Sequence, residues 1–393
     1  MPWKELSVSE ARRRFVLATR EKRESFASLC GRFGISRKSG YKWLKRWREG
    51  GVRALKDRSR RPDYCAKAHR SFWREALQQA RAARPHWGPK KLQRVLQKRF
   101  PACPRLPAVS TLALWLGQSG SVAQRKRRAR RGPVLPWRGV QRPKGPNEVW
   151  TIDFKGWFRT GDGGRCEPLT VRDLFSRYVL AVVLVPKPSE AAVRRALQPV
   201  FRRYGLPQTI RVDNGAPFGG NGALGLSRTS VWWLRLGIAV DFIRPAHPQD
   251  NGAHEQMHRV FQAEVAAPPA QSVRAQNRRH QAWIRSYNQE RPHEALSQQV
   301  PAELYRPSAR RMPPRLEVVS YPRSWKVRRV RNRGHIKWKG RQRFIGRAFV
   351  GELVGLKTTS EGIQEVYLEG HLLGLLYERD PTGMRPASRA RHP

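Results

Sequence analysis

The sequence predicts a multidomain protein: an all-α N-terminal part with helix-turn-helix units, a central α/β domain with a mixed sheet, and a small all-β barrel at the C-terminus. Three observations lead to this prediction. Apolar residues recur at helical spacing through roughly the first 120 residues, strands and helices then alternate, and after residue 322 the apolar period changes to two. A length of 393 residues leaves room for several domains with cores of their own.

The first domain, residues 1–50, has the pattern of a helix-turn-helix. A helix is expected over 9–20, a second begins after the capping residue Ser25, and a third follows over 37–48 after the short turn at Gly34. The third helix would lie in the major groove of DNA, or it is a helical hairpin with a solvated basic face. The cations of this helix that we expect to contact DNA are Arg37, Lys38, Lys42, Lys45 and Arg46.

A second helical domain is expected over 51–122, as a weaker helix-turn-helix candidate. Pro89 suits the first turn of one helix, and Ser110 can cap another. The following segment, 123–146, is a proline-containing linker rich in Lys and Arg, which either lies along DNA phosphates or is simply solvated. The linker cations that we expect to contact DNA are Arg127, Arg128 and Arg131.

The α/β domain is expected over 147–305, and its order of strands and helices predicts a mixed sheet. The short stretch between the second and third strands predicts a hairpin. The expected strands are 149–158, 167–173, 177–185, 209–212 and 238–243, and the expected helices are 189–204, 227–236, 251–265 and 272–287.

After a proline-spaced linker over 306–322, short strands with glycine-containing turns predict the barrel over 323–380, followed by a disordered tail over 381–393. Lys and Arg residues interleave with Trp325 and Trp338 in these strands, a combination that can bind nucleic acid. The expected strands are 326–330, 335–338, 343–345, 352–357, 365–368 and 371–376.

The net charge of +50, from 79 Lys and Arg against 29 Asp and Glu, indicates a polyanionic partner, of which nucleic acid is the commonest. A generally basic proteome would account for only part of this excess. No apolar run is long enough for a membrane span, and the four cysteines form neither a zinc motif nor a disulfide pattern. A cytoplasmic protein with reduced thiols is expected.

Three acids are the candidates for chemistry. Asp153 lies within an otherwise apolar strand, Asp213 ends a buried strand, and Glu255 lies in the first turns of a helix. Two strand carboxylates and one helix carboxylate can converge at one edge of a sheet and offer hard oxygen ligands to Mg²⁺. Each acid also has a structural explanation, since Asp-Asn-Gly is a turn signal and a Glu near a helix N-terminus is favoured by the dipole.

Other acids have simpler explanations. Asp173 sits at the expected hairpin, Asp162 in a glycine-rich turn, and Asp250 could cap the helix that starts at Asn251. Glu264 comes late in that helix. His254, His258 and Arg259 lie on or near the same helix and either contact DNA or serve local structure.

Three sequence blocks carry a family resemblance. They are Trp150-Thr-Ile-Asp-Phe-Lys-Gly, Arg211-Val-Asp-Asn-Gly-Ala-Pro-Phe and His247-Pro-Gln-Asp-Asn-Gly-Ala-His-Glu-Gln-Met-His-Arg. They resemble the signature blocks of bacterial insertion-sequence transposases with a retroviral-type integrase core, the DDE recombinases. The resemblance extends over nearly the whole chain. It implies an RNase H-like central fold.

The resemblance also implies a catalytic triad that binds two Mg²⁺ ions, with Mn²⁺ as a substitute. The triad maps onto Asp153, Asp213 and Glu255, with Asp153 as the ligand shared by both ions. Asn214 is expected to orient Asp213, and Asn251 and Gly252 to set the start of the helix that carries Glu255. No zinc is expected, because the zinc module of retroviral integrases is absent.

The sequence therefore predicts an enzyme, a DNA transposase. It would bind the terminal repeats of a mobile element, hydrolyse phosphodiester bonds at the DNA ends and join the 3′-hydroxyls to target DNA. Its partners would be double-stranded DNA and further copies of the chain, in a homodimer or higher assembly on DNA. The protein would be associated with the nucleoid and not with a membrane. The alternatives are a non-catalytic DNA-binding regulator with an integrase-like core and a basic RNA-binding protein, neither of which needs three converging acids.

Overall fold

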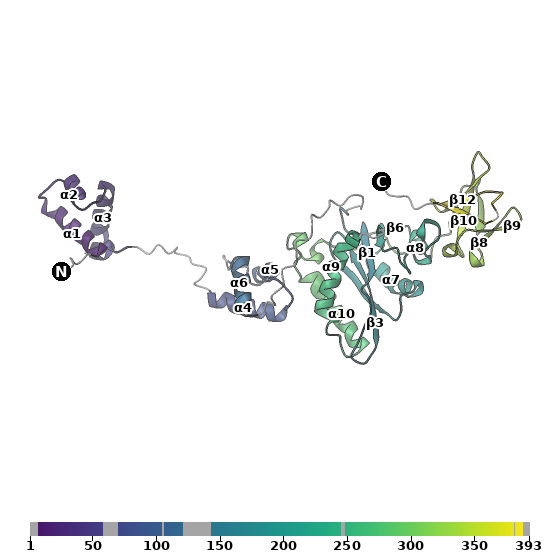
Figure 1. The fold of residues 1–393 in the computed structure, drawn as a ribbon, viewed down its shortest axis with the longest axis horizontal. Coiled ribbons are helices and arrows are strands. Elements are labelled where there is room, and N and C mark those ends of the chain that lie inside the picture. The colour runs from purple at the N-terminus through teal and green to yellow at the C-terminus, as the bar shows by residue number, and fades with distance from the viewer. Residues whose placement is uncertain are drawn as a thin grey trace. The chain divides into compact units, whose positions relative to one another are not determined.

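The computed structural model of the chain describes residues 7–57, 70–103, 106–120, 143–244, 248–380 and 382–387. The chain divides into two compact units, Met1–Arg70 and Ser71–Pro393 (Figure 1). Arg127, Arg128 and Arg131, the linker cations expected to contact DNA, lie outside the described residues.

The first unit is a small helical domain, with helices α1 (Val8–Glu21), α2 (Phe26–Arg32) and α3 (Arg37–Gly50) and the short 3₁₀ helix η1 (Gly51–Leu55). Ser7, Ser25 and Ser36 each accept a hydrogen bond from a backbone N–H of the first turn of the helix that follows, so the cap predicted at Ser25 is confirmed. The three-helix pattern predicted for this segment is confirmed. The core, made by Phe15, Val16, Leu29, Cys30 and Leu55, extends beyond residue 50.

Helices α4 (Arg70–Ala83), α5 (Pro89–Arg99) and α6 (Val109–Gln118) begin the second unit and pack around Trp87 and Leu92. Pro89 stands in the first turn of α5, as predicted. The cap predicted at Ser110 is wrong: α6 begins at Val109, so Ser110 already lies inside its first turn and makes no capping bond.

Strands β1 to β6 form one mixed sheet. β3 (Arg165–Asp173) pairs with β1 (Val149–Phe154) and β4 (Val179–Val185) in antiparallel fashion, which confirms the predicted hairpin. β5 (Thr209–Val212) is parallel to β1 and to β6 (Ala239–Phe242). The first strand ends at Phe154 rather than at Phe158, because the chain turns through Gly156 (φ 89°) before the short β2 (Phe158–Arg159).

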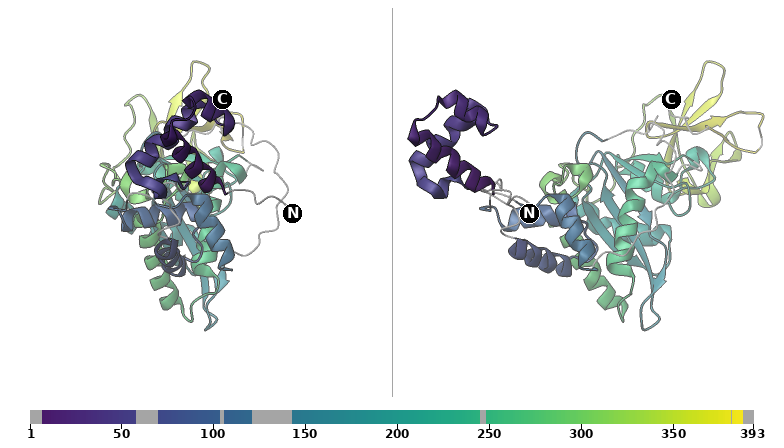
Figure 2. Two further views of the ribbon diagram at one scale, coloured as in Figure 1. Left: turned by 90° about the vertical axis from the view of Figure 1, so that its left-hand side faces the viewer. Right: turned by 60° about the vertical axis from the view of Figure 1, so that its left-hand side comes forward.

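Helices cover both faces of this sheet (Figure 1 and Figure 2). α7 (Glu190–Tyr204) and α8 (Arg228–Arg235) pack against Trp150 and Ile152 of β1. α9 (Gly252–Phe261) and α10 (Val273–Gln289) pack against Val179 and Val182 of β4. The remaining short helices are η3 (Ala223–Gly225), η4 (Pro248–Asn251), the π-helical η5 (Gln262–Ala266), η6 (Glu294–Leu296) and α11 (Pro301–Leu304). None of the helices in the described ranges has the length and apolar character needed to cross a lipid bilayer.

The C-terminal strands form an antiparallel sheet in the order β13-β12-β11-β10-β7 and a separate hairpin of β8 and β9. The predicted barrel is not confirmed, since no pairing among the described residues closes this sheet. The short strand β13 lies within the expected tail. The bounds are β7 (Lys326–Arg329), η7 (Asn332–Gly334), β8 (His335–Trp338), β9 (Arg341–Phe344), η8 (Arg347–Phe349), β10 (Leu353–Thr358), β11 (Gln364–Leu368), β12 (His371–Leu376) and β13 (Arg385–Pro386).

The C-terminal sheet can stay open because other elements cover its apolar face. Val354 and Leu356 of β10 share one core with Ile336 of the hairpin and with Val231 and Leu234 of α8. A sheet that buries its apolar face against other elements gains the hydrophobic free energy that closure would have supplied. The C-terminal sheet is therefore packed onto the α/β domain.

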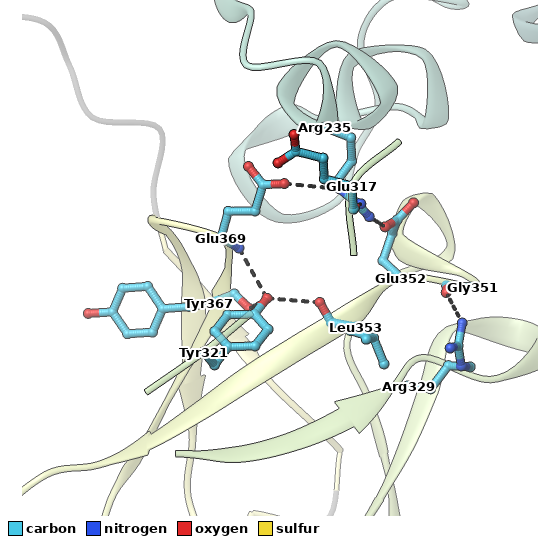
Figure 3. A network of polar contacts seen from close by, with 9 residues as sticks. All are labelled: Arg235, Glu317, Tyr321, Arg329, Gly351, Glu352, Leu353, Tyr367 and Glu369. Atoms are coloured by element: carbon cyan, nitrogen blue, oxygen red, sulfur yellow. Dashed lines mark hydrogen bonds and ion pairs between the residues drawn. The ribbon is translucent and has the colours of Figure 1, made fainter. Parts of the chain in front are cut away.

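Arg235, at the end of α8, adds a polar connection to this contact (Figure 3). Its guanidinium forms ion pairs with Glu352 and with Glu369, the latter at 3.0 Å, and also donates to the carbonyl oxygen of Glu317. The Arg235 side chain is 9% exposed, so these bonds replace nearly all of its hydration. A single arginine thus joins α8 to the C-terminal sheet and to the linker before that sheet, which contains Glu317.

We expect Arg235→Met to lower the free energy of unfolding by about 2–4 kcal/mol, because it leaves two partly buried carboxylates without their cation. The C-terminal sheet should also become more sensitive to protease. Lys339→Met is the matched control, since Lys339 pairs with Glu378 at an exposed position and should change stability by less than about 1 kcal/mol. Urea unfolding of both variants measures the difference. Equal effects would contradict the role given to Arg235.

Candidate active site

Asp153 and Asp213 lie at the same end of two neighbouring parallel strands. The register pairs Thr151 of β1 with Arg211 of β5, and each aspartate is two residues further along in the same direction. Side chains two residues apart in a strand share a face. The strand register thus brings the two carboxylates together, at the carboxyl ends where open α/β sheets place their sites.

Glu255 reaches this edge from α9. The helix begins at Gly252 with Asn251 as its N-cap residue, and the Glu255 side chain is exposed. The electrostatics of Asp153 report the proximity of all three acids. Burial, then the charge of Asp213 and to a lesser degree that of Glu255, raise the pKa of Asp153 to about 7. The charges of both other predicted acids therefore act on Asp153.

Asp213 is also held in an unfavourable environment for a bare carboxylate. Burial raises its pKa, although a hydrogen bond from the backbone N–H of Gly215 opposes the shift. Its Oδ1 atom is buried and has no hydrogen-bond partner among the described residues. A buried carboxylate oxygen without a partner is costly unless a cation or water satisfies it.

The residues expected to orient the acids lie beside them. The Asn214 side chain donates through Nδ2 to the carbonyl oxygen of Ile243 at 2.5 Å, which ties the end of β5 to the end of β6. The Asn251 side chain is buried and makes no capping bond, and its Oδ1 has no hydrogen-bond partner within the described ranges. Gly252 is the first residue of α9.

His254 and His258 serve local structure. Both are buried, and the rings lie 4.7 Å apart. Nδ1 of His254 is 2.6 Å from the Thr151 hydroxyl, and its Nε2 is 2.6 Å from that of Thr170. Nε2 of His258 is 2.8 Å from the Thr170 hydroxyl. Arg259, by contrast, is exposed.

Asp153, His254 and His258 form a cluster whose ligand atoms lie within 4.8 Å of one another, close enough to hold a metal ion. His254 is a poor ligand there, because both of its ring nitrogens already face threonine hydroxyls. The Nδ1 atom of His258 lies 3.8 Å from Oδ2 of Asp153. Burial and the charges of Lys155 and Arg172 lower the pKa of His258 to about 3, so this contact is no ion pair at neutral pH.

The other acids have structural partners. Asp173 accepts from Ser176 and from the backbone of Asn147, as expected at the hairpin. Asp162 accepts from Thr160 and Gly164 in its turn. Glu264 pairs with Arg291 and accepts from Trp283. Asp250 was expected to cap α9, but it pairs with Arg244 at 2.8 Å, and Asn251 is the N-cap residue.

In the N-terminal unit, α3 carries the cations expected to contact DNA. Arg37, Lys38, Lys42 and Lys45 are exposed and Arg46 is partly buried. The Arg46 guanidinium lies 4.9 Å from the centre of the Trp43 ring, and Lys42 lies 5.3 Å from it. Most cations of α3 are therefore exposed to solvent, and two of them lie against the Trp43 ring.

Comparison with known families agrees with these features. Models of the integrase core domain match residues 143–248 and 236–301. A helix-turn-helix domain model matches residues 11–62, and the C-terminal domain of IS481 family transposases matches residues 325–376. The first model covers β1 to β6, and the second covers α9 and Glu255. Together, these matches support a bacterial insertion-sequence transposase with an integrase core.

Individual relatives are insertion-element proteins. The chain is 31% identical over 196 residues to an uncharacterized 31.7 kDa protein of insertion element IS407 from Burkholderia multivorans, covering 48% of this chain and 66% of that protein. It is 30% identical over 203 residues to a 39.2 kDa protein of IS476 from Xanthomonas euvesicatoria, covering 51% and 56%. The chain thus spans less than two thirds of each relative's length.

A solved structure with a similar chain course is the catalytic core domain of HTLV-2 integrase in complex with magnesium. It is 15% identical, has a TM-score of 0.34, and covers 42% of this chain and 100% of that one.

Three residues that line the sheet beneath α9 were not predicted as part of the site: Thr151, Thr170 and Arg172. The signal was present as strand alternation. In β1, Trp150 and Ile152 enter the apolar core while Thr151 and Asp153 face the other way, and β3 repeats the pattern. Polar residues at alternate positions of two paired strands indicate a polar patch on one sheet face.

Proposed function

We propose that this chain is a DNA transposase. It binds the terminal repeats of its mobile element, hydrolyses phosphodiester bonds at the ends and joins the 3′-hydroxyls to target DNA. The observation that carries the proposal is the convergence of Asp153, Asp213 and Glu255 at one edge of the sheet, with Asp153 sensing both other charges. Within the described ranges none of the three acids forms an ion pair with an arginine or lysine, although the chain has a net charge of +50, and this favours a cation site over an ion-pair network.

The residues fit a divalent metal. The pKa of Asp153 is raised, and Asp213 has a buried oxygen without a partner in the described part of the chain; a bound cation would remove both penalties. Carboxylate oxygens are the ligands that Mg²⁺ and Mn²⁺ prefer. A pair of such ions supplies activation of the attacking water or 3′-hydroxyl and stabilisation of the leaving oxygen.

Each residue then has a task. Asp153 would be a ligand of both ions, and Asp213 and Glu255 would each complete one site. Asn214 fixes the turn that carries Asp213 through its bond to Ile243. Asn251 and Gly252 set the start of α9 and so the direction of Glu255.

The main DNA-binding surfaces would lie in other parts of the chain than the metal site. The basic face of α3 binds the element ends in the major groove, and the linker with Arg127, Arg128 and Arg131 follows the phosphate backbone. Because two ends must be joined to one target, the active form is a homodimer or a larger assembly on DNA. A protein that acts on chromosomal DNA works in the cytoplasm at the nucleoid.

The test uses DNA that carries the inverted repeats flanking the gene. Wild-type protein should nick this DNA at the element ends in Mg²⁺, and EDTA should abolish nicking. Glu255→Gln should lose nicking while its affinity for the ends stays within about twofold. Gln256→Ala, a change at the exposed neighbour on α9, should keep both activities. End binding without nicking by the wild-type protein would instead identify a non-catalytic regulator.

A further inference from the structure

We propose that His254, held between the hydroxyls of Thr151 and Thr170, is the positioning residue that fixes Glu255 relative to Asp153. The inference rests on the proposed function, since it concerns the same three acids. Glu255 and Asp153 lie on different elements, a helix and a strand. Something other than chain connectivity must therefore set their separation.

The sheet face beneath α9 is built for polar contact. The antiparallel register of β1 and β3 pairs Asp153 with Thr170 and Thr151 with Arg172. These four side chains lie on one face, because the intervening Ile152 and Val171 enter the apolar core on the other face. Thr151, Thr170 and Arg172 are buried. Asp153 thus stands at the edge of a buried polar patch.

α9 meets this patch at the residues next to Glu255. His254 is fully buried and contacts both threonines through its two ring nitrogens, each at 2.6 Å. Nη1 of Arg172 donates to the carbonyl oxygen of Ala253. One turn further on, His258 contacts the same Thr170 hydroxyl at 2.8 Å. The polar contacts therefore fix the helix on both sides of Glu255.

The hydrogen atoms of this network can be assigned. The Thr170 hydroxyl donates its one hydrogen to the carbonyl oxygen of Asp153 at 2.9 Å, because a carbonyl can only accept. It must then accept from Nε2–H of His254 and from Nε2–H of His258. Nδ1 of His254 is left as an acceptor for the Thr151 hydroxyl. Each hydrogen-bonding donor of the two threonine hydroxyls and the two neutral histidine rings thus meets an acceptor.

The hydrogen bonds of this network constrain the orientation of α9 on the sheet. Met257 and Phe261 pack α9 against Val179 and Val182, but apolar contacts constrain the rotation and translation of a helix less sharply than hydrogen bonds do. The bonds of His254 span β1 and β3, and Thr170 also bonds the backbone of Asp153 itself. The same hydroxyl therefore contacts the metal-binding strand and the metal-binding helix.

The test removes one hydroxyl without changing the shape of the side chain. Thr170→Val should weaken Mn²⁺ binding to the full chain by about 10–100-fold, measured by isothermal titration calorimetry, and raise the Mn²⁺ concentration for half-maximal nicking by a similar factor. Thr170→Ser keeps the hydroxyl and should stay within about threefold of wild type. Thr229→Val is the matched control: Thr229 is buried in α8, and its hydroxyl has no hydrogen-bond partner in the described ranges.

The outcomes separate the two claims. Wild-type protein that neither binds Mn²⁺ nor nicks DNA would end the proposed function. Wild-type protein that does both, together with a folded Thr170→Val that binds Mn²⁺ equally well, would overturn the positioning role alone. If Thr170→Val fails to fold, Thr151→Val decides, because it removes only the bond to Nδ1 of His254. Unchanged Mn²⁺ affinity in that variant would likewise overturn the inference.

Discussion

Asp153→Asn is expected to reduce metal-dependent nicking of element ends by at least about 10³-fold, because it removes the carboxylate that both proposed metal sites share. Binding of the ends should stay within about twofold, since the cations expected to contact DNA lie elsewhere. The measurement is single-turnover nicking in Mg²⁺ beside an end-binding titration. Asp162→Asn, which alters an acid held in a turn by Thr160 and Gly164, is the control and should nick normally.

The same substitution should stabilise the metal-free protein. The folded structure holds Asp153 with a pKa of about 7, which means that folding disfavours its charge through burial and through the charges of Asp213 and Glu255. An uncharged amide of the same shape escapes this penalty. We expect the Asp153→Asn variant to unfold at a higher temperature than wild type when metal is removed with EDTA, and a lower temperature would contradict the raised pKa.

The sign of the pH dependence follows from the same shift. In the unfolded chain the pKa of Asp153 is ~3.9, so between that pH and about 7 the folded protein binds more protons than the unfolded one. The contribution of Asp153 to stability therefore falls as pH rises through this window and is constant above it. The stability difference between wild type and Asp153→Asn, measured by urea unfolding in EDTA, should grow from pH 4 to pH 7.

Lys42→Ala combined with Arg46→Ala is expected to weaken binding of the element ends by about 10–100-fold at ~0.1 M salt. Both residues lie on α3, beside the ring of Trp43. If both neutralise phosphates, the slope of log affinity against log salt should become shallower by about 1.8. Fluorescence anisotropy of labelled ends across a salt series gives both quantities.

The control for this pair replaces two cations of α1. Arg13 and Arg14 are exposed and lie near Glu10, one turn away on their own helix. Arg13→Ala combined with Arg14→Ala removes the same charge from the same domain and should have a clearly smaller effect. Unchanged affinity and an unchanged salt slope in the α3 variant would show that this helix is not a major DNA contact.

Much of the fold could be predicted because it depends on local pattern. The buried strand predicted over 209–212 is β5, and Ser25 caps α2 as its sequence position indicates. The barrel could not be predicted reliably, because closure depends on what else can cover the apolar face, and here α8 and a hairpin cover it. The cap predicted at Ser110 was wrong because the ends of a helix are set by tertiary packing as much as by capping residues.

Part of the candidate site could also be predicted from the sequence. Asp153, Asp213 and Glu255 stood out because acids are scarce in this chain and because their blocks resemble a known family. The contact between His254 and Thr170 could not be predicted, since it joins residues 84 positions apart. The distribution of basic residues in the sequence also did not show which of them are available to contact DNA. Lys90 and Lys98 of α5 form ion pairs with Glu294 and Glu303 of the α/β domain rather than remaining free for DNA.

Three carboxylates are proposed to hold one pair of metal ions. The most direct measurement is the number of Mn²⁺ ions bound per chain, by electron paramagnetic resonance on the protein–DNA complex. It should be made for wild type, Asp153→Asn, Asp213→Asn, Glu255→Gln and the control Asp162→Asn. Two ions are predicted for wild type and the control, none or a single weakly bound ion for Asp153→Asn, and a loss of one ion in each of the other two variants. Two ions retained at unchanged affinity in any of the three triad variants would contradict this proposal.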